Sequence, residues 1–243
     1  MTYLYDGSFE GFLTLIHDSY THKRRVDKII KNPLEMDLLD DVNSIITNRT
    51  YAMRVLEGLK QKFKRHYFER IFQTFLCDGQ DFEKPLYDFV VLGFRDQKYL
   101  EDILHPSILY LENLHLAYFR YLHKMYGFVR FEELEDGILY AKIDGKFNIL
   151  PYLGSHFIKR LDGFDFIIHD MARSLAYISI EGKGRINEVK DFDLPTYSKE
   201  ELKFQKLWKT FLKSVTIKER KNPKLQQSWV PLLYREYMLE FDS

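Results

Sequence analysis

Histidine and arginine side chains recur at a helical spacing in the second half of this 243-residue sequence. His156 and Arg160 are four residues apart, which places both side chains on one face of a helix. Arginine offers a planar, bidentate donor and histidine changes its charge near neutral pH, so the pair suits the binding of an anion. A surface pair held by backbone groups and a neighbouring carboxylate explains the spacing equally well, and the sequence alone leaves both interpretations open.

Asp170 and Arg173 follow a short alternating apolar segment, residues 164–168. Aspartate in such a place commonly caps and braces a turn. Asp170 could instead join Arg130 in a buried ionic network, or act with His156 as an acid–base pair if the two lie together in a cleft. We predict that one contiguous site unites five residues: Arg130, His156, Arg160, Asp170 and Arg173.

The segment 203–224 has the most one-sided charge of the chain, with eight Lys or Arg residues against a single Glu. A charged run is most often a solvated surface, but Asn and Pro interrupt this one and Trp229 follows it. Cations can hold phosphates, and an exposed aromatic ring is a platform on which a base stacks. We predict that Arg220, Asn222 and Lys224 contact nucleic acid or a nucleotide, and that Trp229 packs in a core.

Several classes of function find no support in the sequence. Glycine-rich loops that bind phosphates or dinucleotides are absent, and the eight histidines show no metalloprotease spacing. The single cysteine, Cys77, excludes an internal disulfide framework, a cysteine zinc site and a three-cysteine iron–sulfur site. Basic and acidic residues total 36 each, which weighs against binding to nucleic acid through bulk charge. With no signal peptide and no long apolar run, we expect a soluble cytoplasmic protein without a membrane span.

The elements that carry these residues change at Gly127. Before it, helical periods dominate, after a short strand at residues 2–5 and a helix capped by Ser8, with a second short strand at residues 42–46. After it come two alternating segments, a helix and two more alternating segments, at 128–131, 138–143, 148–161, 164–168 and 174–181. We predict an α+β protein with a mainly helical region at 1–126 and, at 127–243, an antiparallel β-β-α-β-β unit with C-terminal helices, the whole forming one compact domain.

Several short motifs, taken together, resemble those of one bacterial family. In chain order they are Tyr5-Asp-Gly-Ser-Phe-Glu-Gly-Phe12, Gly127-Phe-Val-Arg-Phe131, His156-Phe-x-x-Arg160, Ile168-His-Asp170-x-x-Arg173, Leu207-Trp208 and the segment from Arg220 to Gln226. Each motif alone is weak, but their joint order resembles the DUF4130 family, whose members are described as DNA metabolism or DNA repair proteins.

The resemblance implies a partner protein. The family is associated with a radical S-adenosylmethionine protein of DNA modification or repair, and in other bacteria it is fused to a uracil-DNA-glycosylase-like domain, which this sequence does not contain. We therefore expect no cofactor in this chain, with the iron–sulfur cluster and S-adenosylmethionine only on the partner.

Two functions follow from these observations. One is an accessory protein that binds DNA, RNA or a nucleotide through its arginines. The other is a stand-alone enzyme that acts on a nucleic-acid base or nucleotide, with His156 and Asp170 as acid and base. The balanced charge and the lack of a cofactor motif favour the accessory protein.

Overall fold

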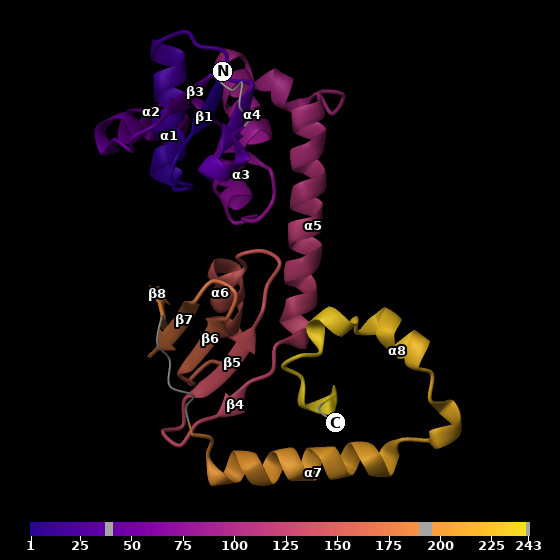
Figure 1. Ribbon diagram of the computed structural model, residues 1–243. Helices are drawn as coiled ribbons and strands as arrows, with labels where there is room; N and C mark the ends of the chain where they lie inside the picture. The colour runs from indigo at the N-terminus through magenta and orange to yellow at the C-terminus, as the bar shows by residue number, and fades with distance from the viewer. Residues whose placement is uncertain (37–40, 190–195, 242–243) are drawn as a thin grey trace. The chain divides into compact units, whose positions relative to one another are not determined.

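The computed structural model describes residues 1–36, 41–189 and 196–241. The chain divides into two compact units, Met1–Tyr118 and Phe119–Ser243. The division falls inside helix α5 (Pro106–Phe128), whereas the sequence analysis placed the boundary at its end. The predicted combination of a helical first half with mixed α and β structure is confirmed (Figure 1).

The first unit contains a small parallel sheet with strand order β2-β1-β3. Its elements are β1 (Thr2–Leu4), α1 (Phe9–Thr21), β2 (Lys28–Ile30), β3 (Val42–Ser44), α2 (Arg49–Lys62), α3 (Arg65–Phe75) and α4 (Glu83–Arg95), followed by the first part of α5. The second short strand predicted at residues 42–46 is present as β3, which pairs with β1 so that Tyr3 faces Asn43 in the ladder. Ser8 caps α1 as predicted, accepting a hydrogen bond from the backbone of Gly11 at 2.9 Å.

Strand β2 has no counterpart in the sequence analysis. It is three residues long and follows a basic run, so the sequence there has neither the length nor the alternation of apolar and polar residues by which a strand is predicted. The strand exists because its backbone pairs with β1, with Ile29 opposite Tyr3. Large side chains then fill the space between the sheet and the helices, and the fully buried ones include Tyr3, Phe12, Leu59, Ile71, Leu86 and Phe89.

The second unit is built on a five-stranded sheet with order β4-β5-β6-β7-β8. Its strands and the helix among them are β4 (Glu132–Glu133), β5 (Leu139–Ile143), α6 (Leu150–Arg160), β6 (Phe166–Asp170), β7 (Leu175–Ile180) and β8 (Lys183–Glu188). The predicted antiparallel arrangement is wrong at the centre, because β5 and β6 pair in parallel. Helix α6 connects them as a crossover, and such a connection returns the chain in its original direction.

Two further expectations for this unit are corrected. The segment 128–131 is not a strand: Phe128 is the last residue of α5, and the hairpin strand is β4, which pairs with β5. The last strand expected from the sequence ends at residue 181, but β8 continues the sheet as an exposed edge strand. All six residues of β8 are exposed, so the sequence there lacks the apolar alternation that marks a half-buried strand.

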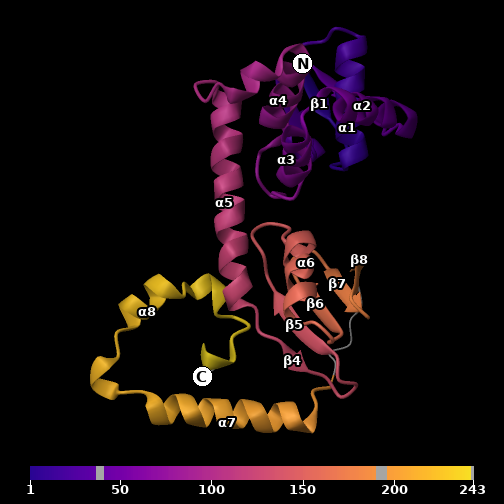
Figure 2. The same cartoon turned by 180° about the vertical axis from the view of Figure 1, so that it is seen from behind.

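Helix α6 covers one face of the five-stranded sheet, behind it in Figure 1 and in front of it in Figure 2. Gly154 of α6 lies against the ring of Tyr177 on β7. Tyr177 pairs with Ile168 across the ladder, so the side chain of Ile168 also lies on the α6 side of the sheet. Every second residue of a strand lies on the same side, so Asp170, two residues after Ile168, lies on the α6 side as well. His169 lies on the opposite side.

The C-terminal segment continues with α7 (Lys199–Val215), a single turn η3 (Lys218–Arg220), α8 (Pro223–Trp229) and two further turns, Leu232–Tyr234 and Leu239–Phe241. Ser198 caps α7 by accepting a hydrogen bond from the backbone of Glu201 at 3.0 Å. None of the helices in the described ranges has the length and apolar character needed to cross a membrane.

Candidate functional site

Asp170 and Arg173 form an ion pair where the parallel strands β5 and β6 end. Asp170 is fully buried, and its Oδ2 accepts a hydrogen bond from Nη1 of Arg173 at 2.9 Å. The same nitrogen donates to the backbone oxygen of Gly145, in the turn after β5, at 2.7 Å. One guanidinium thus ties together the turns that follow both strands. Bracing of a turn is one of the roles for Asp170 between which the sequence could not decide.

His156 and Arg160 lie on α6, as their spacing predicts. The His156 ring stacks on Tyr126 of α5, with ring centroids 4.0 Å apart, and its buried Nε2 has no hydrogen-bond partner among the described residues. Burial lowers the pKa of His156, and the charges of Arg160 and Lys159 lower it further. The imidazole is therefore neutral at neutral pH, so the cationic member of this pair is Arg160, which is exposed at the C-terminal end of α6.

Arg130 has a partner far along the chain. Its Nε and Nη2 donate to Oε1 of Glu240 at 2.9 and 2.7 Å, and its Nη1 donates to the backbone oxygens of Gly127 and Val129. Its side chain is 37% exposed and that of Glu240 is 19% exposed. Most of the hydrogen-bonding capacity of this guanidinium is thus used to hold the C-terminal turn.

The structure brings Asp170 and Arg173 together and gives His156 and Arg130 other partners, Tyr126 and Glu240. A single site that contains all five residues stays a prediction. Sequence reasoning also missed a buried polar pair on the other side of the sheet, where the hydroxyl of Tyr140 lies 3.0 Å from Nδ1 of His169. The signal that could have pointed to it is that His169 follows Ile167 by two residues, so its side chain lies on the side of β6 opposite to Ile168 and Asp170.

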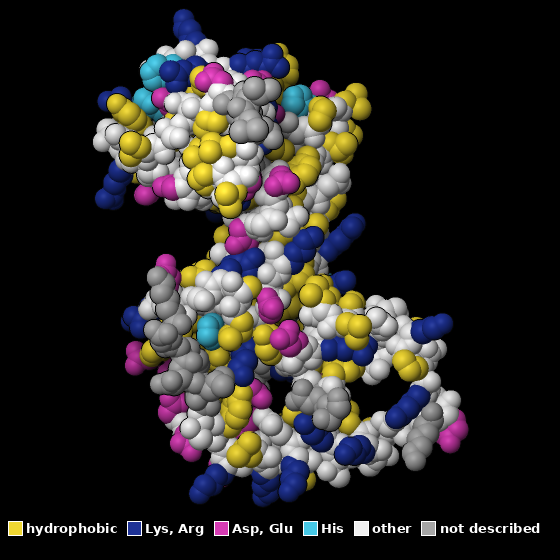
Figure 3. Space-filling view, in the orientation of Figure 1, with side chains coloured by type: hydrophobic (Ala, Val, Ile, Leu, Met, Phe, Trp, Pro, Cys, Tyr) yellow, Lys and Arg dark blue, Asp and Glu magenta, His cyan; other side chains and the backbone are white. Residues whose placement is uncertain are grey.

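A hollow of about 1240 Å³ lies within the C-terminal segment, between α7, η3, α8 and the last turn. Figure 3 shows this open space with several basic side chains around it. Its lining includes four cations, Lys209, Lys213, Arg220 and Lys221, against one carboxylate, Glu240. Glu240 is paired with Arg130, so the other charged side chains of this lining are all cations.

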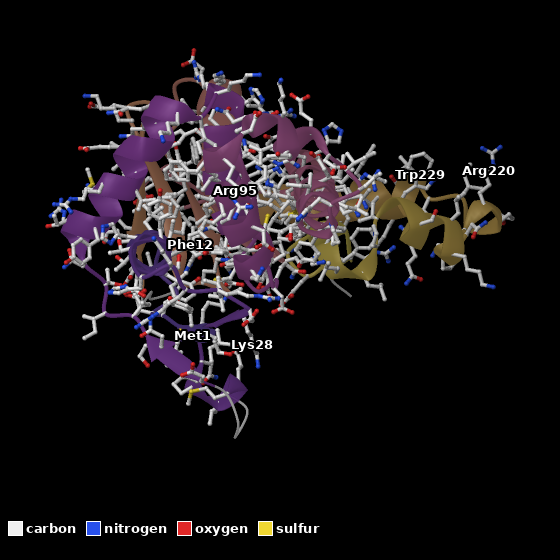
Figure 4. All side chains as sticks on the ribbon, turned by 90° about the horizontal axis from the view of Figure 1, so that it is seen from above. Met1, Phe12, Lys28, Arg95, Arg220 and Trp229 are labelled. Atoms are coloured by element: carbon white, nitrogen blue, oxygen red, sulfur yellow. The ribbon has the colours of Figure 1, made fainter. Side chains whose placement is uncertain are left out.

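Trp229 also lines this hollow, and the prediction that it packs in a core is wrong. Its side chain is 75% exposed, because it ends the seven-residue helix α8 and none of the described segments packs an apolar layer over it. Arg220 and Trp229 project to the same side of the C-terminal segment in Figure 4. An aromatic face and a guanidinium are thus presented together, which suits an unpaired base and its phosphate.

The two other predicted contact residues differ in their roles. The side chain of Asn222 caps α8 by accepting a hydrogen bond from the backbone of Leu225 at 3.0 Å. Lys224, two residues further on, is exposed and makes no ion pair among the residues that the structure describes. Asn222 therefore shapes the end of the hollow, whereas Lys224 is open to an anion.

Within the described ranges, no group of three or more His, Cys, Asp or Glu side chains is placed to hold a metal ion. The thiol of Cys77 is buried, and burial raises its pKa to about 12, so it is protonated at neutral pH. The C-terminal hollow offers cations, amides and an aromatic ring, which are groups able to contact an anion and an aromatic base.

Comparison with known protein families gives a match. A family model described as a domain of unknown function, DUF4130, matches residues 80–240, which is well over half of the chain. The matched region begins just before α4 and includes the five-stranded sheet and the C-terminal hollow, but not the small parallel sheet. None of the curated proteins matches the sequence. The chain therefore belongs to the DUF4130 family.

Proposed function

We propose that this protein is an accessory protein of DNA metabolism that binds nucleic acid and acts beside a radical S-adenosylmethionine protein. The observation that carries the binding proposal is the C-terminal hollow, where cations surround an exposed tryptophan. The process and the partner rest on the family resemblance. The iron–sulfur cluster and S-adenosylmethionine would belong to the partner.

Electrostatics supports the C-terminal segment as the contact surface. The chain has no net charge, so attraction to a phosphate backbone requires a local excess of cations. Residues 203–224 supply that excess, and Arg220 and Lys224 are exposed within it. Both can release counterions from a nucleic acid when they bind its phosphates.

Trp229 adds a preference for unpaired bases. Stacking of a base on an aromatic side chain contributes about 1–3 kcal/mol, and it requires a base whose face is free. The indole ring of Trp229 is exposed and can stack on a base, whereas the Asp170–Arg173 pair is buried and contains no aromatic ring. We therefore place the first contact with nucleic acid at the hollow rather than at the strand ends.

A stand-alone enzyme with His156 and Asp170 as acid and base is the weaker proposal. Asp170 is held by Arg173, and His156 stacks on Tyr126. An acid–base pair would have to break both arrangements. No observation in the described structure favours that rearrangement.

The binding proposal is tested with fluorescence anisotropy, using a labelled single-stranded oligonucleotide and the matching duplex over a range of salt concentrations. Replacing Arg220 and Lys224 with alanine should weaken binding at low salt and reduce the slope of log K against log salt by roughly 0.7–0.9 per lost contact. Trp229→Ala should cost about 1–3 kcal/mol for the single strand and less for the duplex, and Trp229→Phe should restore part of the loss.

The matched control replaces two exposed lysines of the first unit, Lys60 and Lys98, which should leave the slope unchanged. Thermal melts establish that every variant is folded. Parental binding by a folded Arg220→Ala/Lys224→Ala protein at all salt concentrations would overturn the proposal. Co-purification with the radical S-adenosylmethionine protein, with and without the oligonucleotide, tests the partner separately.

A further inference from the structure

Gln226 and Trp229 lie on the same side of helix α8. They are three residues apart, which separates them by about 4.5 Å along the helix axis, and both line the C-terminal hollow. Gln227 and Ser228, which lie between them in the sequence, do not line it. The helix therefore presents an amide group beside an exposed indole ring.

The amide of Gln226 is free to bind a ligand. Three of the described residues that line the hollow carry a hydroxyl or an amide, namely Thr216, Asn222 and Gln226. The hydroxyl of Thr216 donates to the backbone oxygen of Leu212, and Oδ1 of Asn222 accepts the hydrogen bond that caps α8. The side chain of Gln226 is exposed and makes no hydrogen bond with the rest of the described chain.

An unpaired base needs the two kinds of group that this amide supplies. The Watson–Crick edge of every base carries a hydrogen-bond donor next to an acceptor. Lysine and arginine side chains only donate, so the cations of the hollow cannot accept a hydrogen bond from that edge. The carboxylate of Glu240 could accept one, but its Oε1 is held by Arg130 and its Oε2 is buried. Among the described side chains of the lining, this leaves Gln226 with an uncommitted acceptor, Oε1, beside an uncommitted donor, Nε2.

We propose that Gln226 contacts the Watson–Crick edge of an unpaired base that stacks on Trp229. This inference rests on the proposed binding of nucleic acid and names the form of base that the hollow takes. In a duplex that edge is already paired, so a base must be unpaired to bind in this way. A half-turn of the amide exchanges its donor and its acceptor, so the contact excludes none of the four bases. The hollow therefore distinguishes unpaired from paired bases without choosing a sequence.

The test compares oligothymidylate with the same oligomer built from N3-methylthymine, by competition in fluorescence anisotropy. The methyl group removes the N3 donor and blocks the edge, but it leaves the phosphates unchanged and the ring free to stack. The parent protein should bind the unmethylated oligomer roughly three- to tenfold more tightly, which is the contribution of a single hydrogen bond. Gln226→Met keeps the length of the side chain without the amide, so it should bind both oligomers with the lower affinity.

The matched control is Gln227→Met, because Gln227 is the next residue, is also exposed and does not line the hollow. This variant should distinguish the two oligomers as the parent does. Gln226→Met should bind an abasic oligomer and a duplex with parental affinity, because neither offers an unpaired Watson–Crick edge. Its loss of affinity should be the same for oligocytidylate as for oligothymidylate. Circular dichroism establishes that each variant is folded.

The outcomes separate this inference from the proposed function. If the parent binds no oligonucleotide, both are overturned. If the parent binds the two oligomers equally well, or if folded Gln226→Met still distinguishes them, the contact with the base edge is wrong and nucleic-acid binding stands. An equal loss of affinity by Gln226→Met for the abasic oligomer would also overturn the inference, because it would show that Gln226 acts on the backbone contacts and not on the base.

Discussion

Arg130 and Arg220 show that the surroundings of an arginine determine what it can bind. The guanidinium of Arg130 is shared among Glu240 and two backbone oxygens, so a phosphate could reach it only by displacing them. Arg220 is exposed at the edge of the hollow. In the sequence, both arginines are candidate contacts for an anion. The partners of Arg130 indicate a structural role, whereas the exposure of Arg220 is compatible with binding.

Arg130→Ala should therefore act on stability. Its removal leaves the partly buried carboxylate of Glu240 without its cation, which should lower the free energy of unfolding of the second unit by about 1–3 kcal/mol. Urea denaturation followed by circular dichroism measures the change. Arg160→Ala, an exposed arginine of the same unit, should stay within about 0.5 kcal/mol of the parent. Equal stability of both variants would contradict this role for Arg130.

His115 should make the first unit less stable in mild acid. Its Nε2 lies 2.9 Å from the hydroxyl of Thr74, and burial together with the charge of Arg70 lowers its pKa to about 4. The unfolded chain binds a proton near pH 6.5, whereas the folded chain does so only near pH 4. Between these values the unfolded state holds more protons, so stability falls as the pH is lowered, by about 3 kcal/mol over the window.

The measurement is a series of urea denaturations from pH 7.5 to pH 4. His115→Gln should remove this part of the pH dependence, because glutamine does not titrate. His123→Gln, an exposed histidine of the same helix, should keep the parental slope. If the His115→Gln variant kept the parental dependence of stability on pH, other groups would be responsible for that dependence.

The packing of α6 on the sheet depends on one small residue. A Cβ atom at Gly154 would lie 2.4 Å from ring carbons of Tyr177, which is closer than packed atoms come. Tyr177 is itself almost fully buried and stacks on Phe166, with ring centroids 6.1 Å apart. Neither ring has room to retreat, so the close approach of helix and sheet requires glycine here.

Gly154→Ala should thus destabilise the second unit by about 1–3 kcal/mol, although alanine is the better helix former. The control is Gly127→Ala in α5 of the same unit, where a Cβ meets no atom within 4 Å. That change should be neutral or slightly stabilising. Chemical denaturation compares the two, and a stabilised Gly154→Ala protein would show that α6 can move away from Tyr177.

At the scale of the whole molecule, two units have separate buried side chains. Leu86 is fully buried in the first unit, and Ile168 is fully buried in the second. Truncation of such a residue to alanine costs about 2–5 kcal/mol. Leu86→Ala should accelerate amide hydrogen exchange in residues 1–118, and Ile168→Ala should do so in β5–β7. Mass spectrometry localises the exchange, and acceleration throughout the chain by either change would show one cooperative unit.

Much of the local structure could be predicted from residues close together in the sequence. The cap at Ser8 is present, and α6 lies within the helix expected at residues 148–161. At the candidate site, the shared helix of His156 and Arg160 and the adjacency of Asp170 and Arg173 also follow from spacing. In each case the interaction links residues three or four positions apart, so the sequence contains both partners within one turn.

The sequence by itself determined the mixed α and β composition, the helical first half and the basic character of the C-terminal segment. Only the tertiary structure decided the parallel pairing of β5 with β6, the partner of Arg130 and the exposure of Trp229. The reason is distance along the chain: Arg130 and Glu240 are 110 positions apart, and nothing near either residue marks the other. Burial likewise depends on which distant segments cover a side chain. The residues next to Trp229 in the sequence do not indicate that the described segments leave its side chain uncovered.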